Sequence, residues 1–374
     1  MGKVKSINRH NLKVARINMG FDVFYASKRV SSVKDIVSQW EKGDALPTWT
    51  QVKNLAKLYN IQELIFFSDE NIKENRVIPD FRVGVEEDEK DKIKKLVNLV
   101  LKRQSRLEKI LKDDGCSKNK LIGSGKDIKK PTDLAKYISD RLEIDLEEIK
   151  NISGSDSRKK TLKCLINKAE DKGIFIGKTI SYHNISVKNM RGLFISNNYC
   201  PFIILNKKDA VSAQIFSLIH ELAHLFRKTE SISNNIDFRD SNNNISPEEV
   251  FCNKVAANLL LPASEFTESF YDKDSIEHLA DKYKLSELFV FYRLKDLKKI
   301  KDQDLADIEI VLKKESEENI KKKELSKDKG GNYYNNMRDS NGALFNRVVL
   351  GTYLENKINF TEASNLLSFS VEKV

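Results

Sequence analysis

The chain has 374 residues, more than a single compact core usually serves, so we expect about two or three domains. Hydrophobic residues make up 40% of it and charged residues 32%, which excludes a membrane-embedded or wholly disordered chain. The first residues contain no apolar export segment, and no apolar run reaches the roughly eighteen residues of a membrane span. We therefore expect a cytoplasmic protein without a membrane partner.

Charge and cysteine usage narrow the chemistry further. The four cysteines form no C-x-x-C pair, which favours reduced thiols over a disulfide framework or a cysteine metal site. The net charge of +10 comes from 65 basic and 55 acidic residues, a mild excess on a heavily charged chain. Such a charge permits nucleic-acid binding without requiring it.

The N-terminal part reads as a small helical domain. Between residues 11 and 69, short helical patterns alternate with turn residues, which predicts four or five short helices around one core. Thr48, after Pro47, is the expected N-cap of one helix, and Ser31 and Ser32 offer an N-cap to the helix before it. We assign residues 1–70 to this domain.

A helical connector is predicted next, over residues 71–158. Apolar residues recur at helical spacing from 93 to 111 and stop near Gly115, and a second helical pattern runs from 132 to 149. A third helix, from 159 to 172, opens the following domain, which we place at 159–300.

That domain mixes strands and helices. Short β-rich runs at 173–180, 191–198 and 200–206 predict a small sheet. The helix predicted at 210–227 is apolar on nearly every side and should be buried, and another runs from Ser246 to just before Pro262. A helix-turn-helix pattern follows at 275–300, and residues 301–374 read as a charged linker with a last helix at 343–367. The expected fold class is α+β, mostly helical.

The buried helix carries the sequence His220-Glu221-Leu222-Ala223-His224. Residues four apart share a helix face, so both imidazoles can bind one zinc ion, and Glu221 lies where it can reach a metal-bound water. Glu221 is then the general base and acid of peptide-bond hydrolysis. The alternative is a metal-free pair of histidines, but three ionisable groups on an apolar helix are costly unless something satisfies them.

A catalytic zinc needs a third protein ligand, and the helix after Ser246 offers Glu248 and Glu249. Spacing alone does not choose between them. Ser246-x-x-Glu249 is also a capping box, in which Glu249 would only bond back to the backbone of Ser246.

These segments resemble a known family. FSLIHELAHLF at 216–226, followed by EVFCNKVAANLLLP at 249–262, resembles the ImmA/IrrE zinc metallo-endopeptidases. Aligned on Pro262, the resemblance implies that Glu249 is the third ligand and Asn253 the family's asparagine, with Cys252 in place of the usual alanine. It further implies a zincin-like peptidase domain that cleaves a DNA-binding repressor or a similar, antitoxin-like regulator.

The N-terminal domain resembles Xre-type, lambda-repressor-like helix-turn-helix proteins, through Ala26, the Trp40–Gly43 segment and Pro47-Thr48. In that fold residues 32–39 would be the recognition helix, with four side chains directed at a major groove: Ser32, Lys34, Asp35 and Gln39. Basic residues nearby would add phosphate contacts: Lys3, Lys5, Arg9, Lys13 and Arg16. The alternative is a domain that docks a protein substrate or forms a homodimer.

Two further expectations complete the sequence-based hypothesis. The strand at 202–205, with Ile203 and Ile204, is predicted to be a sheet edge that pairs with an extended substrate. The favoured function is a zinc-dependent endopeptidase, and the rival is a transcriptional regulator whose zincin domain is a sensor or an inactive scaffold. Glu221 separates them, because a sensor needs metal ligands but no general base.

Overall fold

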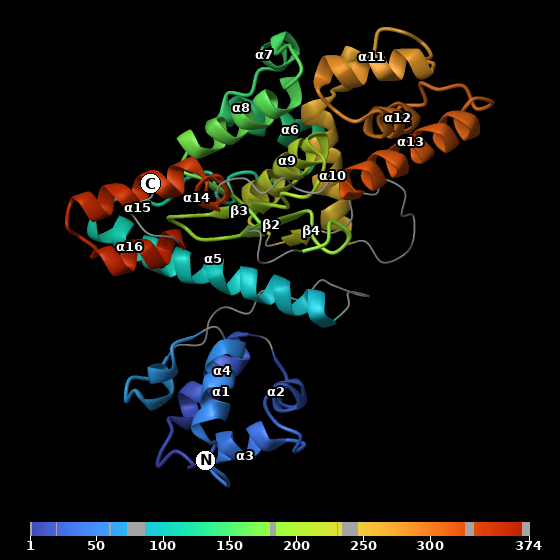
Figure 1. The fold of residues 1–374 in the computed structure, drawn as a ribbon. Helices are drawn as coiled ribbons and strands as arrows, with labels where there is room; N and C mark the ends of the chain where they lie inside the picture. Colours follow the sequence, from blue (N-terminus) through green and yellow to red (C-terminus); the bar gives the residue numbers. More distant parts are fainter. Residues whose placement is uncertain are drawn as a thin grey trace. The chain divides into compact units, whose positions relative to one another are not determined.

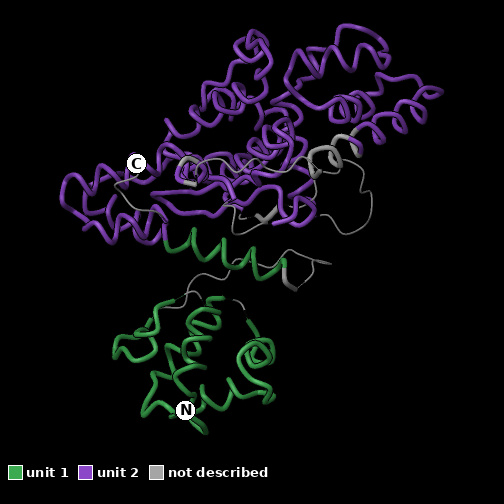
Figure 2. Tube along the Cα trace, viewed as in Figure 1, with its two compact units in different colours: residues 1–102 green, residues 103–374 purple. Residues whose placement is uncertain are grey.

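A computed structural model describes residues 2–19, 21–59, 61–72, 87–179, 185–229, 231–233, 246–325 and 333–368. The chain divides into two compact units, Met1–Lys102 and Arg103–Val374 (Figure 2). The division falls within the long helix α5 (Glu87–Asp113), which ends, as expected, two residues before Gly115 with its φ of +71°. The domain borders expected at 70, 158 and 300 remain predictions.

The first unit contains the short helices that the sequence predicts. They pack around one core that includes Leu12, Trp40 and Leu55, each at most 1% exposed. Their bounds are α1 (Arg9–Asn18), α2 (Val23–Val30), α3 (Ile36–Lys42), α4 (Trp49–Leu58) and the 3-10 helix η1 (Glu63–Phe67).

Helix caps confirm one prediction in this unit and correct another. Thr48 caps α4 in a reciprocal capping box with Gln51. By contrast, the residue that precedes α3 is Asp35, in the left-handed conformation with φ 57°, and not Ser31 or Ser32. The predicted recognition helix therefore begins too early. Ser32 and Lys34 lie in the exposed turn before α3, because a residue with positive φ ends the helical geometry on that side.

Two contacts fix side chains in the first unit. The hydroxyl of Ser27 on α2 accepts a hydrogen bond from the backbone N–H of Val37 on α3, at 3.1 Å, and ties the two helices together. The guanidinium of Arg16 forms two hydrogen bonds to Glu41, at 2.6 and 2.9 Å, and the residue is 8% exposed. Arg16 and Glu41 thus form a structural ion pair. Because Arg16 is buried in this pair, the expectation that it contacts phosphates is corrected.

The second unit begins with helices that join the main core. The predicted helix over 132–149 is two helices, α6 (Pro131–Leu142) and α7 (Leu146–Asn151). Glu143, with φ 56°, ends α6, and the carboxylate of Asp145 caps α7 by accepting from the N–H of Glu147. The helix α8 (Ser157–Asp171) follows, and residues of α6 and α8 lie in the same hydrophobic core as the sheet.

The sheet has strands β1 (Phe175–Lys178), β2 (Gly192–Ile195), β3 (Phe202–Leu205) and β4 (Ser231–Ser233) in the order β1-β3-β2-β4. β3 pairs in parallel with β1 and antiparallel with β2, so Ile203 lies between Ile176 and Phe194. The prediction that β3 is a substrate-binding edge is therefore wrong. The backbone of Ile203 and Ile204 is already paired on both sides and cannot accept another strand.

Helices cover both faces of the sheet (Figure 1). On one face, Phe194 and Ile203 share a core with Ile219 and Leu222 of α9 (Val211–Arg227). On the other face, Phe202 packs against Phe345 of α15 (Ala343–Leu354), with ring centroids 5.9 Å apart. The alternation of the two faces follows from the period of two in a strand.

The remaining helices complete the unit: α10 (Pro247–Leu260), η2 (Ala263–Glu265), α11 (Lys273–Tyr283), α12 (Glu287–Asp296), α13 (Leu305–Leu325), α14 (Tyr333–Asn341), α15 and α16 (Phe360–Leu367). The last helix predicted, 343–367, is in fact the pair α15 and α16, preceded by an unpredicted α14. In the described ranges, no helix has the length and apolar character that a bilayer span requires.

Candidate metal centre

The helix α9 buries three ionisable residues. His220 and Glu221 are 0% exposed and His224 is 1% exposed, within a helix whose other side chains from 214 to 226 are also buried. Because residues 220 and 224 are one turn apart, their rings lie on the same face, 4.7 Å apart between centroids. Glu221 is rotated away from that face, toward the sheet.

The two histidines meet one carboxylate from α10. Nε2 of His220 lies 3.1 Å from Oε2 of Glu249, Nε2 of His224 lies 3.2 Å from Oε1, and the two Nε2 atoms are 3.1 Å apart. Ligand atoms around a tetrahedral zinc ion, each about 2.0–2.2 Å from it, lie roughly 3.3–3.6 Å from one another. The distances among these two nitrogens and the two oxygens of one carboxylate are close to that range, so these residues fit a metal ion.

The neighbouring glutamate points elsewhere. Glu248 pairs through both carboxylate oxygens with Arg227, at 2.5 and 3.1 Å. Ser246 caps α10 by accepting from the backbone N–H of Glu249, at 3.2 Å, while the carboxylate of Glu249 faces the histidines. The Ser246 cap is therefore present, but the Glu249 carboxylate contacts the histidines and does not complete the predicted capping box. A second group of possible ligand atoms, His224, Glu248 and Cys252, shares His224 with the first.

A residue that sequence reasoning missed orients His224. The hydroxyl of Thr229 lies 2.8 Å from Nδ1 of His224 and 3.4 Å from Oε1 of Glu248. Through Glu248 the hydroxyl is linked to Arg227, so a chain of polar contacts runs from the surface to the back of the imidazole. Contacts of this kind fix the ring of a ligand histidine and the nitrogen it offers to a metal.

The charges of the clustered residues shift one another's pKa values. Burial acts to lower the pKa of His220, but the hydrogen bond to Glu249 and the negative charge of Glu221 outweigh it, and the net shift is upward. Burial acts to raise the pKa of Glu249, but its hydrogen bonds to His220 and His224 lower it well below the ordinary value. Without metal, the carboxylate and a protonated imidazole therefore stabilise each other, and a metal ion would take the place of the proton.

Of the residues that the sequence assigns to the peptidase site, His220, His224 and Glu249 form one cluster. Asn253 is buried, 8% exposed. A side-chain hydrogen bond with Asn253 contributes to the raised pKa of His220. Ile203 and Ile204 lie in the centre of the sheet, whereas Ser32, Lys34 and Gln39 belong to the first unit.

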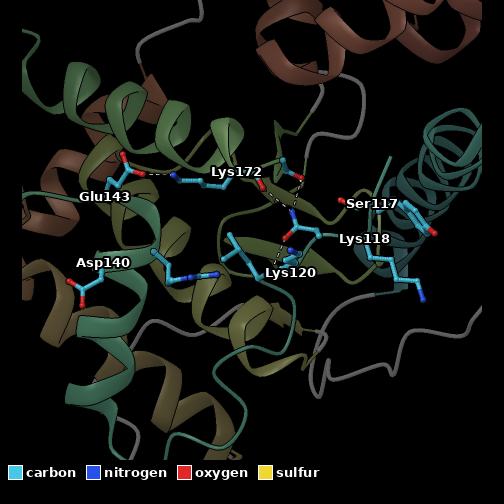
Figure 3. Close-up of a pocket in the computed structure, with 11 residues that line it drawn as sticks. Ser117, Lys118, Lys120, Asp140, Glu143 and Lys172 are labelled. Atoms are coloured by element: carbon cyan, nitrogen blue, oxygen red, sulfur yellow. Dashed lines mark hydrogen bonds and ion pairs between the residues drawn. The ribbon is translucent and has the colours of Figure 1, made fainter. Parts of the chain in front are cut away.

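A separate opening of about 650 Å³ lies elsewhere in the second unit (Figure 3). It is lined by the loop before α6, the end of α6 and the end of α8, and none of its residues belongs to the metal cluster. Figure 3 shows Lys172 reaching toward Glu143, with which it forms an ion pair, and Asp140 as another lining residue.

Two buried histidines and a carboxylate, on adjacent helices against a small sheet, form the site of a metallopeptidase-like domain. Residues 176–295 match the family model of the IrrE N-terminal-like domain, a peptidase family. The match runs from within β1 to the end of α12 and contains the entire cluster, which supports the resemblance to the ImmA/IrrE family. No curated protein matches the chain.

Proposed function

We propose that the protein is a zinc-dependent endopeptidase. His220, His224 and Glu249 hold the zinc ion, Glu221 is the general base and acid, and Asn253 supports His220. The observation that carries the proposal is that each histidine Nε2 lies 3.1–3.2 Å from the other and from one oxygen of the Glu249 carboxylate, on two helices inside a region that matches a peptidase family.

Each residue has a defined task in hydrolysis. Bound zinc supplies Lewis acidity toward the scissile carbonyl and makes water more acidic. Glu221, buried one residue after His220, takes the proton of the attacking water and gives it to the leaving amine. Thr229 keeps His224 in the orientation that presents Nε2 to the cluster.

The substrate we propose is a protein, and specifically a DNA-binding repressor or antitoxin-like regulator. The support is the resemblance of the peptidase segments, together with a separate compact N-terminal unit. We also propose that this unit is a helix-turn-helix domain that binds DNA, with Gln39 on α3 and the exposed Lys34 just before it as contacts. If affinity for the upstream DNA of its own gene shows no decrease with rising salt, DNA binding is excluded.

A matched pair of proteins tests the enzyme. The wild type and Glu221→Gln are purified for zinc analysis and co-expressed with candidate regulators, whose fragments are identified by mass spectrometry. We expect about one zinc per chain in both proteins and cleavage only by the wild type. A Glu221→Gln protein that keeps the full biological effect would favour the rival function, a regulator with a sensor domain.

A further inference from the structure

Gly192, the first residue of β2, lies directly beside the proposed general base. It is buried and pairs with Leu205 of β3 and Ser233 of β4, so it occupies an interior position of the sheet. Its φ is not in the positive range that favours glycine. A glycine in a strand interior weakens the strand and often marks a close approach by another group. Backbone geometry therefore does not explain the glycine at position 192, and the close approach of another group does.

The space is filled by Glu221. A Cβ atom added to Gly192 would lie 2.5 Å from Oε1, 2.9 Å from Cγ and 3.1 Å from Cδ of Glu221, and these are its three nearest neighbours. Strand alternation agrees, because residue 192 shares its face with Phe194, which packs in the core with α9. The carboxylate of Glu221 therefore lies against bare backbone.

We propose that Gly192 is a positioning residue for Glu221: the absent side chain provides the place where the carboxylate is held beside the metal cluster. The inference rests on the proposed function, because it assigns Gly192 a part in placing the general base. A side chain at 192 would leave the ligands His220, His224 and Glu249 in place and would displace only the carboxylate, since the end of a buried glutamate moves more easily than a strand.

The first test needs neither substrate nor metal. Melting temperatures are measured on metal-free, full-length protein for wild type, Gly192→Ala, Glu221→Ala and the double variant. We expect Gly192→Ala to lower the melting temperature by roughly 2–8 °C in the wild-type background and not at all in the Glu221→Ala background, where the three clashing atoms are gone. An equal loss in both backgrounds, or no loss in either, overturns the inference.

A second glycine provides the matched control. Gly177 lies in β1 of the same sheet, and a Cβ there would meet Ile204 Cδ1 at 2.9 Å and the carbonyl of Ser340 at 3.0 Å, both outside the site. Gly177→Ala should also destabilise the protein, but its loss should be the same with or without the Glu221 side chain. This control variant distinguishes general crowding of a strand from displacement of the Glu221 carboxylate.

The catalytic consequence is measured on the regulator found cleaved in co-expression. We expect Gly192→Ala to keep about one zinc per chain and the wild-type KM, and to lose about tenfold or more in kcat. Gly177→Ala should keep its kcat. In the Glu221→Asp background, where the carboxylate is one methylene shorter, Gly192→Ala should cost much less. An unchanged kcat in Gly192→Ala overturns the inference and leaves the proposed function standing, whereas cleavage by Glu221→Gln contradicts the function itself.

Discussion

The hydroxyl of Thr229 lies 2.8 Å from Nδ1 of His224, on the side of the ring that faces away from Glu249. Thr229 follows α9 directly, after Lys228 has ended the helix in the left-handed conformation with φ 61°. The turn that stops the metal-binding helix thus also supplies the group that orients its second histidine.

Thr229→Val should weaken zinc binding, because valine keeps the shape of threonine and removes the hydroxyl. Loss of such a contact typically lowers metal affinity about 10- to 100-fold. Competition with a fluorescent chelator measures the change. Thr361→Val, at an exposed position of α16, serves as the control and should bind zinc like the wild type. Equal affinities for both variants would show that Thr229 does not support the metal.

Glu249→Ala and Glu248→Ala should behave differently although the residues are adjacent. The first removes a ligand atom and should abolish stoichiometric zinc binding. The second removes the partner of Arg227, a partly exposed ion pair, and should cost about 1 kcal/mol of unfolding free energy while zinc is kept. Elemental analysis and denaturant titration measure the two effects. Zinc retained by Glu249→Ala would mean that the third ligand lies elsewhere.

The metal-free protein should be most stabilised by the cluster at mildly acidic pH. Because the pKa of His220 is raised above 6.5, its contribution is complete below pH 6.5 and is lost as the pH rises through the folded-state value. Because the pKa of Glu249 is lowered from 4.5, its contribution is present above pH 4.5 and is lost as the pH falls. Denaturant titrations in a chelator, from pH 4 to 9, should therefore show a maximum that Glu249→Gln lacks. Zinc binding should instead strengthen as the pH rises, since the ion competes with the proton.

Ile203→Pro should unfold the second unit, and not merely impair substrate binding. Residue 203 is 0% exposed and lies on a strand paired on both sides, where proline removes a ladder hydrogen bond and is not tolerated. We expect loss of zinc and of cooperative unfolding together. Ile203→Val, which removes one methyl group, should cost about 0.5–1.5 kcal/mol and keep the metal. A folded, zinc-loaded proline variant would contradict the strand order.

The sequence predicts the parts of the site that are local. The spacing of His220 and His224 on an apolar helix indicates the metal, and the helix that supplies Glu249 is visible in its N-cap and its terminal proline. The choice between Glu248 and Glu249 depends on where two helices meet, which spacing alone does not give. Thr229 has no local pattern at all. Gly192 has one, because a glycine inside a β-rich run indicates a close approach, but its partner is 29 positions away.

The fold divides in the same way. Most helices follow from periodicity and caps, and three of the strands follow from apolar runs. The order of the strands depends on pairing between distant segments, so the sequence alone does not reveal that β3 lies inside the sheet. The break between α6 and α7 occurs at Glu143 in a left-handed conformation, where no glycine marks it. Ser32 and Lys34 precede α3, because the helix starts only at Ile36.

The side-chain amide of Gln104, on α5, donates to the carbonyls of Ile195 and Cys200, at 2.8 and 3.1 Å, and so holds the turn between β2 and β3. Any shortened fragment intended for crystallisation or assay has to keep this residue. A boundary drawn at 158, which the chain's amino-acid patterns favour, would discard that tether along with α6. Fragments that start shortly before Arg103 retain it, and expression trials are best begun there.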